Sequence, residues 1–184
     1  TQGGKSGATP THNRVAAYEY IGTPDPTNPY ANRDPRLTAS IVTNGSTWNG
    51  RVIDQSAGGS DDMARANASK TGYYLKKFLT DNLNLTQGQN AQHNWVAYRW
   101  AEVLLNYAEA MNEAYGPDAV PAGYLMSARQ ALQKVRDRAS VNLPKVTASD
   151  KESFRDVVKH ERRIELAFED HRYWDLLRWK DAMD

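Results

Sequence analysis

The stretch 160-HERRIELAFEDHRYWDLLRW-179 is the densest cluster of charges in the chain, and it decides the fold. Glu161, Glu165 and Glu169 recur every four residues, which places them along one face of a helix. Further charged residues surround them in the sequence: Arg162, Arg163, Arg172, Asp175 and Arg178.

These carboxylates are either catalytic or structural. A glycosidase needs two carboxyl groups about 5–10 Å apart on either side of its substrate. Carboxylates one helical turn apart meet that distance in any helix, so the spacing is weak evidence for a glycoside hydrolase. We favour a buried network of ion pairs that locks two helices together, because the planar guanidinium of arginine pairs with carboxylates through two bonds.

The sequence upstream of this cluster predicts two further helices. The first spans Tyr98–Tyr115 without glycine or proline and ends at Gly116-Pro117. The second begins near Pro121 and ends before Pro144. Their apolar residues recur at spacings of three and four: Trp100, Leu104, Tyr107, Met111 and Ala114, then Leu125, Ala128, Leu132, Val135 and Ala139.

A third helix opens at 149-SDKE-152, a capping box in which Ser149 bonds the amide of Glu152. A break near Asp170-His171 leads into a fourth helix, Tyr173–Met183. Helices joined by short loops predict antiparallel helical hairpins of the tetratricopeptide kind. The apolar residues of the third helix are Phe154, Val157, Val158, Ile164 and Phe168.

Residues 1–94 differ from the helical residues 95–184, because they are rich in Gly, Pro, Asn, Thr and Ser. The stretch 24-PDPTNPYANRDPR-36 holds four prolines and excludes a long helix. We predict a loop-rich, partly irregular half with a short helix at Asn13–Tyr20 and short strands or extended pieces at Leu37–Thr43 and Tyr73–Leu79. Turn signals separate these pieces at Asn44-Gly45, Asn49-Gly50 and Gly58-Gly59.

The composition narrows the possible functions. Lys and Arg number 23 against 22 Asp and Glu, so we expect neither nucleic acid nor an anionic membrane surface as the main partner. The chain has no Cys, no apolar run of about eighteen residues and no leader of charged then apolar residues. Its four histidines lack H-E-x-x-H spacing, and no G-x-S-x-G or phosphate-binding glycine loop occurs. We therefore predict no metal site, no cofactor and no catalytic residue.

Five stretches resemble the SusD/RagB family, in the order in which that family carries them. They span most of the chain, from about Thr11 to Asp184. The helical ones, 99-RWAEVLLNYAEAMNE-113 and the opening cluster, are long and specific. The others are 28-NPYANRDPRLTASIV-42, 72-GYYLKKF-78 and 131-ALQKVRDRAS-140.

The resemblance implies a mainly α fold, with tetratricopeptide-like hairpins beneath a less regular ligand-binding region. Family members are lipoproteins on the outer face of the outer membrane of Bacteroidetes, where they cap a SusC-like TonB-dependent transporter. They hand it glycans, or peptides in RagB-like members, and do not cleave them. Against the whole family, this chain resembles a C-terminal fragment. It lacks the lipid-bearing Cys that supplies the membrane contact, and a Pro-Ile-Pro-like tail.

The resemblance also assigns the charged residues to the scaffold. Glu102 and Glu109 become partners for Arg136, Arg138, Arg162 or Arg163, and the glutamates of the opening cluster become structural. The predicted structural network is Glu102, Glu109, Glu161, Arg163, Glu165 and Arg172. An interaction scaffold for other proteins is the alternative function, because arrays of helical hairpins commonly bind proteins.

The best candidate for a ligand contact is Trp48, in 44-NGSTWNGR-51, where turn formers flank one large aromatic ring. Asn49 and Arg51 would hydrogen-bond the hydroxyl groups of a sugar, and Tyr30 is a second choice. The alternative is that Trp48 folds back to cover the helical layer. The other tryptophans lie in helical patterns, so we predict that they are packing residues: Trp95, Trp100, Trp174 and Trp179.

Overall fold

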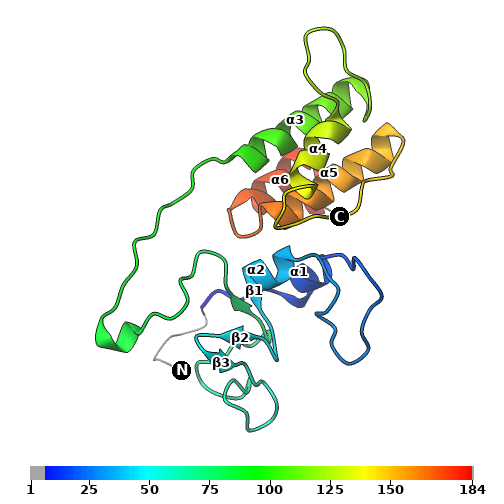
Figure 1. Cartoon of the computed structure of the whole chain (residues 1–184). Helices are drawn as coiled ribbons and strands as arrows, with labels where there is room; N and C mark the ends of the chain where they lie inside the picture. The colour runs from blue at the N-terminus through cyan, green and yellow to red at the C-terminus, as the bar shows by residue number, and fades with distance from the viewer. Residues whose placement is uncertain (1–6, 184) are drawn as a thin grey trace. The chain divides into compact units, whose positions relative to one another are not determined.

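A computed structural model describes residues 7–183 of the chain, with side chains up to residue 182. The chain divides into two compact units, one up to Trp95 and one from Val96 onward (Figure 1). The first unit is built mostly from loops and two-residue strands, and the second from α-helices.

The second unit contains α3 (Trp100–Tyr115), α4 (Ala128–Arg136), α5 (Lys151–Glu165) and α6 (His171–Trp179), followed by the 3-10 helix η2 (Asp181–Met183). Helix α3 packs against both α4 and α5, and α3 and α4 run in opposite directions (Figure 1). The core between these three helices is apolar and includes Leu104, Leu105, Ala108, Ala131, Leu132, Phe154 and Val158. The expected helical hairpin is therefore present.

Helix α3 ends as predicted, at a glycine. Gly116 has a φ of 83° and donates its N–H to the carbonyl of Asn112, 2.9 Å away. A left-handed φ is easily adopted by glycine, which explains the stop at this residue.

Helix α4 begins later than predicted, at Ala128 and not near Pro121. Ser127 and Gln130 form a reciprocal capping box, which fixes the first turn there. Gly123, with a φ of 91°, keeps the preceding residues in a loop. Leu125 was expected on the apolar stripe, but it lies in that loop and is 92% exposed. Ala139 lies beyond the helix and is exposed as well.

Helix α5 is capped by Asp150 and not by Ser149, so the predicted capping box was one residue out of register. The carboxylate of Asp150 accepts the N–H groups of Glu152 and Ser153 at 3.0 and 2.9 Å. A carboxylate at a helix N-terminus also interacts favourably with the helix dipole, which favours Asp150 over its neutral neighbour.

The chain turns between α5 and α6. Phe168 and Asp170 have φ values of 64° and 61°, so Glu169 lies in this turn and not on the helix that carries Glu161 and Glu165. Helix α6 begins at His171, two residues before the predicted start. It ends at Trp179 because Lys180 has a φ of 64°.

The first unit contains α1 (His12–Ala16), α2 (Arg36–Ser40), β1 (Ile41–Val42), β2 (Thr47–Trp48), β3 (Arg51–Val52), β4 (Tyr74–Leu75) and the 3-10 helix η1 (Leu85–Gln87). Strands β1 and β4 pair antiparallel, as do β2 and β3. Its buried apolar residues include Val15, Tyr18, Leu37, Ile41, Val42 and Ile53.

Three elements of this unit differ from the prediction, and one of them is β4, which is shorter than the segment Tyr73–Leu79 expected to be extended. The strand expected at Leu37–Thr43 is the helix α2 followed by β1, because the Asp34 carboxylate accepts the N–H of Arg36 at 2.9 Å and starts a helical turn. The helix α1 is shorter than Asn13–Tyr20. The guanidinium of Arg33 takes the carbonyls of Val15 and Tyr18, and a helix that continued to Tyr20 would need the first of them for the N–H of Glu19.

Candidate functional site

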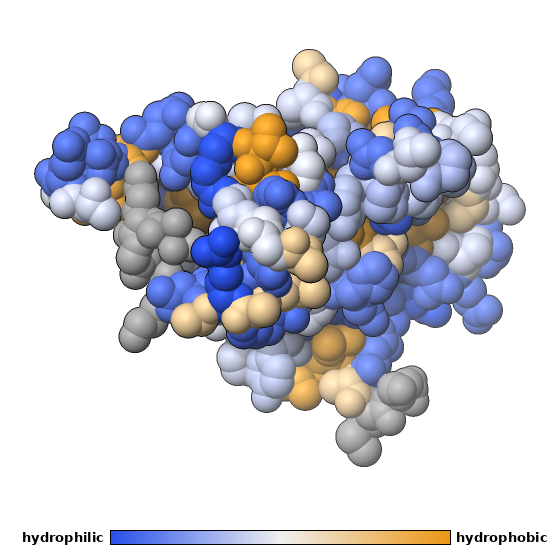
Figure 2. All heavy atoms as spheres, turned by 90° about the horizontal axis from the view of Figure 1, so that it is seen from below, coloured by the Kyte–Doolittle hydropathy of each residue, from blue (hydrophilic) through white to orange (hydrophobic). Residues whose placement is uncertain are grey.

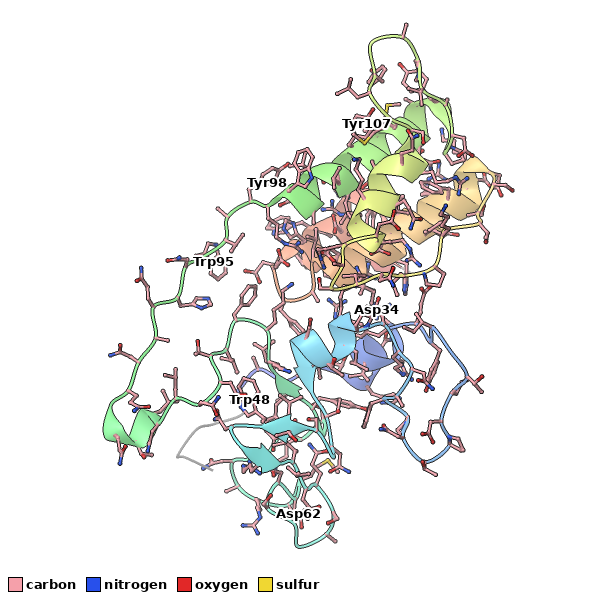
Figure 3. The ribbon with its side chains drawn as sticks, viewed as in Figure 1. Asp34, Trp48, Asp62, Trp95, Tyr98 and Tyr107 are labelled. Carbon is pink, nitrogen blue, oxygen red and sulfur yellow. The ribbon has the colours of Figure 1, made fainter. Side chains whose placement is uncertain are left out.

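The predicted ligand contacts Trp48, Asn49 and Arg51 lie together on the β2–β3 hairpin, and Figure 3 labels Trp48 there. Asn49 and Gly50 have φ values of 49° and 70°, the backbone of a two-residue turn whose twist matches that of the strands. Trp48 and Arg51 are directly paired across the hairpin. The turn chemistry of Asn-Gly therefore produces the hairpin that carries the site.

The tip of the hairpin is clamped to a second loop. The N–H of Asn49 donates to the Asp81 carboxylate at 2.8 Å, and the N–H of Asn82 donates to the Asn49 side-chain oxygen at 2.7 Å. These bonds span more than thirty residues of sequence. Asn49 thus holds the tip in place with its side-chain oxygen.

Arg51 anchors the base of the hairpin. Its guanidinium pairs with both carboxylate oxygens of Asp61, through Nη1 to Oδ2 and through Nη2 to Oδ1 at 2.6 Å, and it also donates to Ser60 at 3.1 Å. Asp61 is only 2% exposed. The hydrogen bond from Arg51 is the main reason why the pKa of Asp61 is lowered to about 2. Arg51 therefore anchors the hairpin, because both Nη groups of its guanidinium bond the Asp61 carboxylate.

Trp48 is partly buried, and a cation lies beside it. The Lys76 ammonium lies 5.9 Å from the centroid of the Trp48 ring and donates to the carbonyl of Thr38 at 2.8 Å. Nothing in the sequence singled out Lys76, since a lysine after a short strand is usually a solvated surface residue.

Tyr30 belongs to a separate aromatic cluster. Its ring meets that of Tyr73 edge-on, with centroids 6.3 Å apart, and His12 stacks on Tyr73 and bonds its hydroxyl at 2.9 Å. Burial, and then the hydrogen bond with Tyr73, raises the pKa of Tyr30 to about 12. The contacts described for the Tyr30 ring are with this cluster and not with the hairpin.

The charged residues of the helical unit form a network around Glu165. Arg99 donates to Glu165 at 2.7 Å and to both oxygens of Glu169, at 2.7 and 2.8 Å. Arg138 donates to the same Glu165 at 2.7 Å. These pairs tie the start of α3 and the end of α4 to the end of α5.

Glu161 has a different partner, Arg136. Their bond is 2.7 Å long and almost fully buried, and the same guanidinium donates to the carbonyl of Pro144 at 3.1 and 3.2 Å. Neighbouring glutamates of α5 are thus held by arginines from different parts of the unit. Arg163 lies next to Arg172, and burial, followed by this like charge, lowers its pKa.

The predicted partners of Glu102 and Glu109 were wrong, because α6 supplies them. Glu109 accepts from the Arg178 guanidinium and from the indole N–H of Trp179, the latter at 2.7 Å. Glu102 lies 3.5 Å from His171. The sequence pattern did not reveal that α6 packs with its charged residues towards α3.

Arg162, which was among the expected partners, joins three helices. It donates to Asn106 on α3 and, at 3.0 Å, to the buried Asp175 on α6. Asp175 also accepts from Arg178 at 2.9 Å.

Three of the four tryptophans outside the hairpin are not packed as predicted, whereas Trp179 is half-buried and donates its indole N–H to Glu109. Trp95 is 75% exposed, and Trp100 and Trp174 are each 66% exposed. Helix α6 buries Asp175 and leaves the stripe Tyr173, Trp174 and Leu177 facing outward. The helical pattern misled here because a polar network, and not an apolar stripe, holds α6.

The described residues offer little else that could form a site. No group of three His, Asp or Glu among residues 7–183 is placed to hold a metal ion. None of the described helices is long and apolar enough to cross a membrane. A partly open hollow on the helical unit is lined by four charged residues together with Asn112, Val158 and Trp179. The charged residues are Glu109, Glu113, Arg155 and Lys159. The surface in Figure 2 is largely hydrophilic, with hydrophobic side chains in small groups.

The chain thus combines a mainly helical unit with a loop-rich unit that carries an aromatic hairpin. The SusD family model matches residues 1–184, and the chain belongs to the SusD family. Its mainly α, tetratricopeptide-like fold is therefore confirmed, and the family resemblance is correct.

The solved relatives include a SusD-like carbohydrate binding protein from Bacteroides fragilis, with 34% identity, a TM-score of 0.75 and coverage of 93% of this chain and 35% of that one. A second SusD-like protein from the same species has 29% identity, a TM-score of 0.76 and coverage of 94% and 36%. A SusD-like protein of Formosa agariphila is 30% identical over 164 residues, which cover 80% of this chain and 30% of the relative. The chain thus spans about a third of the length of these relatives.

Proposed function

We propose that this chain is part of a cell-surface protein that binds glycans without cleaving them. The observation that carries the proposal is its likeness to a SusD-like carbohydrate binding protein across 93% of its length. The proposed ligand surface is the β2–β3 hairpin with Trp48, Asn49 and Arg51. Tyr30 remains a second candidate contact.

The hairpin has the properties that a sugar platform requires. A sugar ring presents apolar C–H groups that pack on an indole face, while its hydroxyls need fixed polar partners. The Asn49 clamp and the Arg51–Asp61 pair hold Trp48 on a rigid support. Rigidity lowers the entropy lost on binding, so even one aromatic contact contributes more. Asn49 retains its side-chain NH₂ group for a sugar hydroxyl.

The carboxylates of the helical unit support a non-catalytic role. A glycosidase acid or base must face its substrate. Glu165 and Glu169 instead accept bonds from arginines on both of their oxygens, and Glu161 is almost fully buried against Arg136. The residues that the sequence offered for catalysis are thus used to hold helices together.

Delivery to a SusC-like TonB-dependent transporter at the outer membrane, with a lipid anchor in the full-length protein, extends the same proposal. The exposed stripe of Tyr173, Trp174 and Leu177 on α6 favours a protein-docking role for the helical unit. A protein-interaction scaffold, or a peptide-binding protein as in RagB-like members, is therefore the second candidate function.

A glycan array combined with a reducing-end assay tests the proposal. We expect the purified protein to bind a subset of glycans and to release no reducing ends from any of them. Release that is lost in Glu161→Gln or Glu165→Gln would overturn the non-catalytic role. Binding of peptides but no glycan would favour the second candidate.

A further inference from the structure

Lys76 is a cation whose charge is not balanced by any carboxylate in the described part of the chain. Its ammonium makes the cation–π contact with Trp48 and one hydrogen bond, to the carbonyl of Thr38. An ammonium group has three N–H donors, so two remain for another acceptor. The basic side chain of the hairpin itself is different, because Arg51 is neutralised by Asp61.

The Lys76 side chain is held in place at its backbone and at its ammonium group. The backbone N–H of Lys76 donates to the carbonyl of Ser40 at 2.9 Å, which fixes the residue just after β4. The side chain is half-buried and ends on the Thr38 carbonyl at 2.8 Å. A lysine whose backbone and ammonium are both fixed in this way loses little conformational entropy when it binds an anion.

We propose that the glycan bound at Trp48 carries an acidic group, either a carboxylate or a sulfate ester, that accepts hydrogen bonds from Lys76. This inference rests on the proposed function. The ammonium lies over the indole face, 5.9 Å from the ring centroid, so a sugar ring stacked on that face would bring its substituents beside the ammonium. Such a bond between an ammonium and an anion is stronger than one to a neutral hydroxyl.

Asp81 is the acidic group of the clamp, and its negative charge is the main source of repulsion for an anionic ligand. One oxygen of its carboxylate already accepts the N–H groups of Asn49 and Asn82, at 2.8 and 2.9 Å. Its charge is therefore partly satisfied by the loop that it holds. Arg51 is committed to Asp61, whereas Lys76 has N–H groups to offer.

Titration calorimetry on the intact protein tests this inference with three sets of oligosaccharides: uronates, sulfated neutral sugars and unmodified neutral sugars. Lys76→Met removes the charge and keeps most of the stem, and Lys76→Arg keeps the charge. Lys145→Met is the matched control, because Lys145 is an exposed lysine of the other unit. The two acidic sets show whether a carboxylate or a sulfate is the anion.

We expect an acidic set to bind more tightly than the neutral one, and Lys76→Met to weaken it about three- to tenfold. Lys76→Arg and Lys145→Met should stay close to wild type, and the preference should shrink as salt is added. Equal binding of neutral and acidic sugars, unchanged in Lys76→Met, overturns the inference and leaves the proposed function standing. Binding of acidic sugars that survives Trp48→Ala overturns the inference and removes the hairpin from the site, while glycan binding itself stands. No binding of any set overturns both. Melting temperatures confirm that each variant is folded.

Discussion

The helical unit and the loop-rich unit differ in how far along the chain their polar groups find partners. In the helical unit, Arg99 reaches Glu165 across 66 residues, and Arg136 reaches Glu161 across 25. In the loop-rich unit, Asp25 bonds Thr27 and Asp54 bonds Ser56, each two residues away. A few bonds of that unit also span long stretches, since Asn49 bonds a loop more than thirty residues on and His12 bonds Tyr73 across 61 residues.

This difference follows from the backbone. A helix satisfies its own N–H and C=O groups, so its charged side chains are available to join distant elements. A loop leaves its backbone groups unpaired, and short Asp, Asn and Ser side chains bond them locally. We therefore expect substitutions in the helical network to act on stability, and substitutions around the hairpin to act mainly on binding.

The largest effect should come from Glu165→Ala. The variant leaves Arg99 and Arg138 without their shared carboxylate in a partly buried site, at a cost of about 3–5 kcal/mol in unfolding free energy. Chemical denaturation measures the loss, and poor soluble yield would be its extreme form. Glu152→Ala is the control, because Glu152 is an exposed glutamate of the same helix, α5. Equal stability of the two variants would contradict the structural role of the network.

Acid should weaken the loop-rich unit through Asp61. Its pKa is about 2 in the folded protein against 3.8 for an unperturbed group, so the folded state favours the ionised carboxylate. That stabilisation, about 2 kcal/mol, is fully present well above the unperturbed pKa and is lost as the pH falls towards the folded pKa. Denaturation across this range should show a smaller loss in Asp61→Asn than in wild type. An identical pH dependence in the two proteins would contradict the Arg51–Asp61 anchor.

The two neighbouring residues at the start of α5 should differ in importance. Asp150→Ala removes the cap and should cost about 1 kcal/mol, whereas Ser149→Ala should change stability by less than about 0.5 kcal/mol. Melting temperatures of the two variants decide between them. The reverse order would restore the capping box that the sequence pattern predicted.

The smallest effect should be that of Asp81→Ala on glycan affinity. Loss of the clamp frees the hairpin tip, and the ordering that binding must then supply should weaken affinity by about two- to fivefold. Asp156→Ala, an exposed aspartate of α5, serves as the control in the same titrations. Equal glycan affinity in the wild type, Asp81→Ala and Asp156→Ala would show that the clamp does not position the site.

The regular features of the chain were predictable from sequence, and the pairing of charges was not. Helix α3 could be predicted because sixteen residues without a breaker end at Gly116-Pro117. The partner of Glu109 could not, because it depends on where α6 packs. The choice between two neighbouring N-cap residues could not be predicted either. Ser149 and Asp150 are both good N-caps, and only the geometry of the first turn selects Asp150.

The candidate site was partly predictable for the same reasons. Asn49-Gly50 is a strong hairpin signal, so the position of Trp48 beside a turn followed from local chemistry. The roles of Asn49 and Arg51 as clamp and anchor did not, since Asp81 and Asp61 are distant or hidden in loops. Lys76 approaches Trp48 only through the pairing of β4 with β1, which no local pattern encodes.

Calorimetric titration of the intact protein and its Trp48→Ala variant with an array-selected glycan tests the central claim most directly. Trp174→Ala is the matched control, because it removes an equally large exposed ring from the helical unit. We predict that Trp48→Ala loses about 1–3 kcal/mol of binding free energy at an unchanged melting temperature, while Trp174→Ala binds as wild type does. Unchanged affinity in a folded Trp48→Ala protein would remove the hairpin from the binding site.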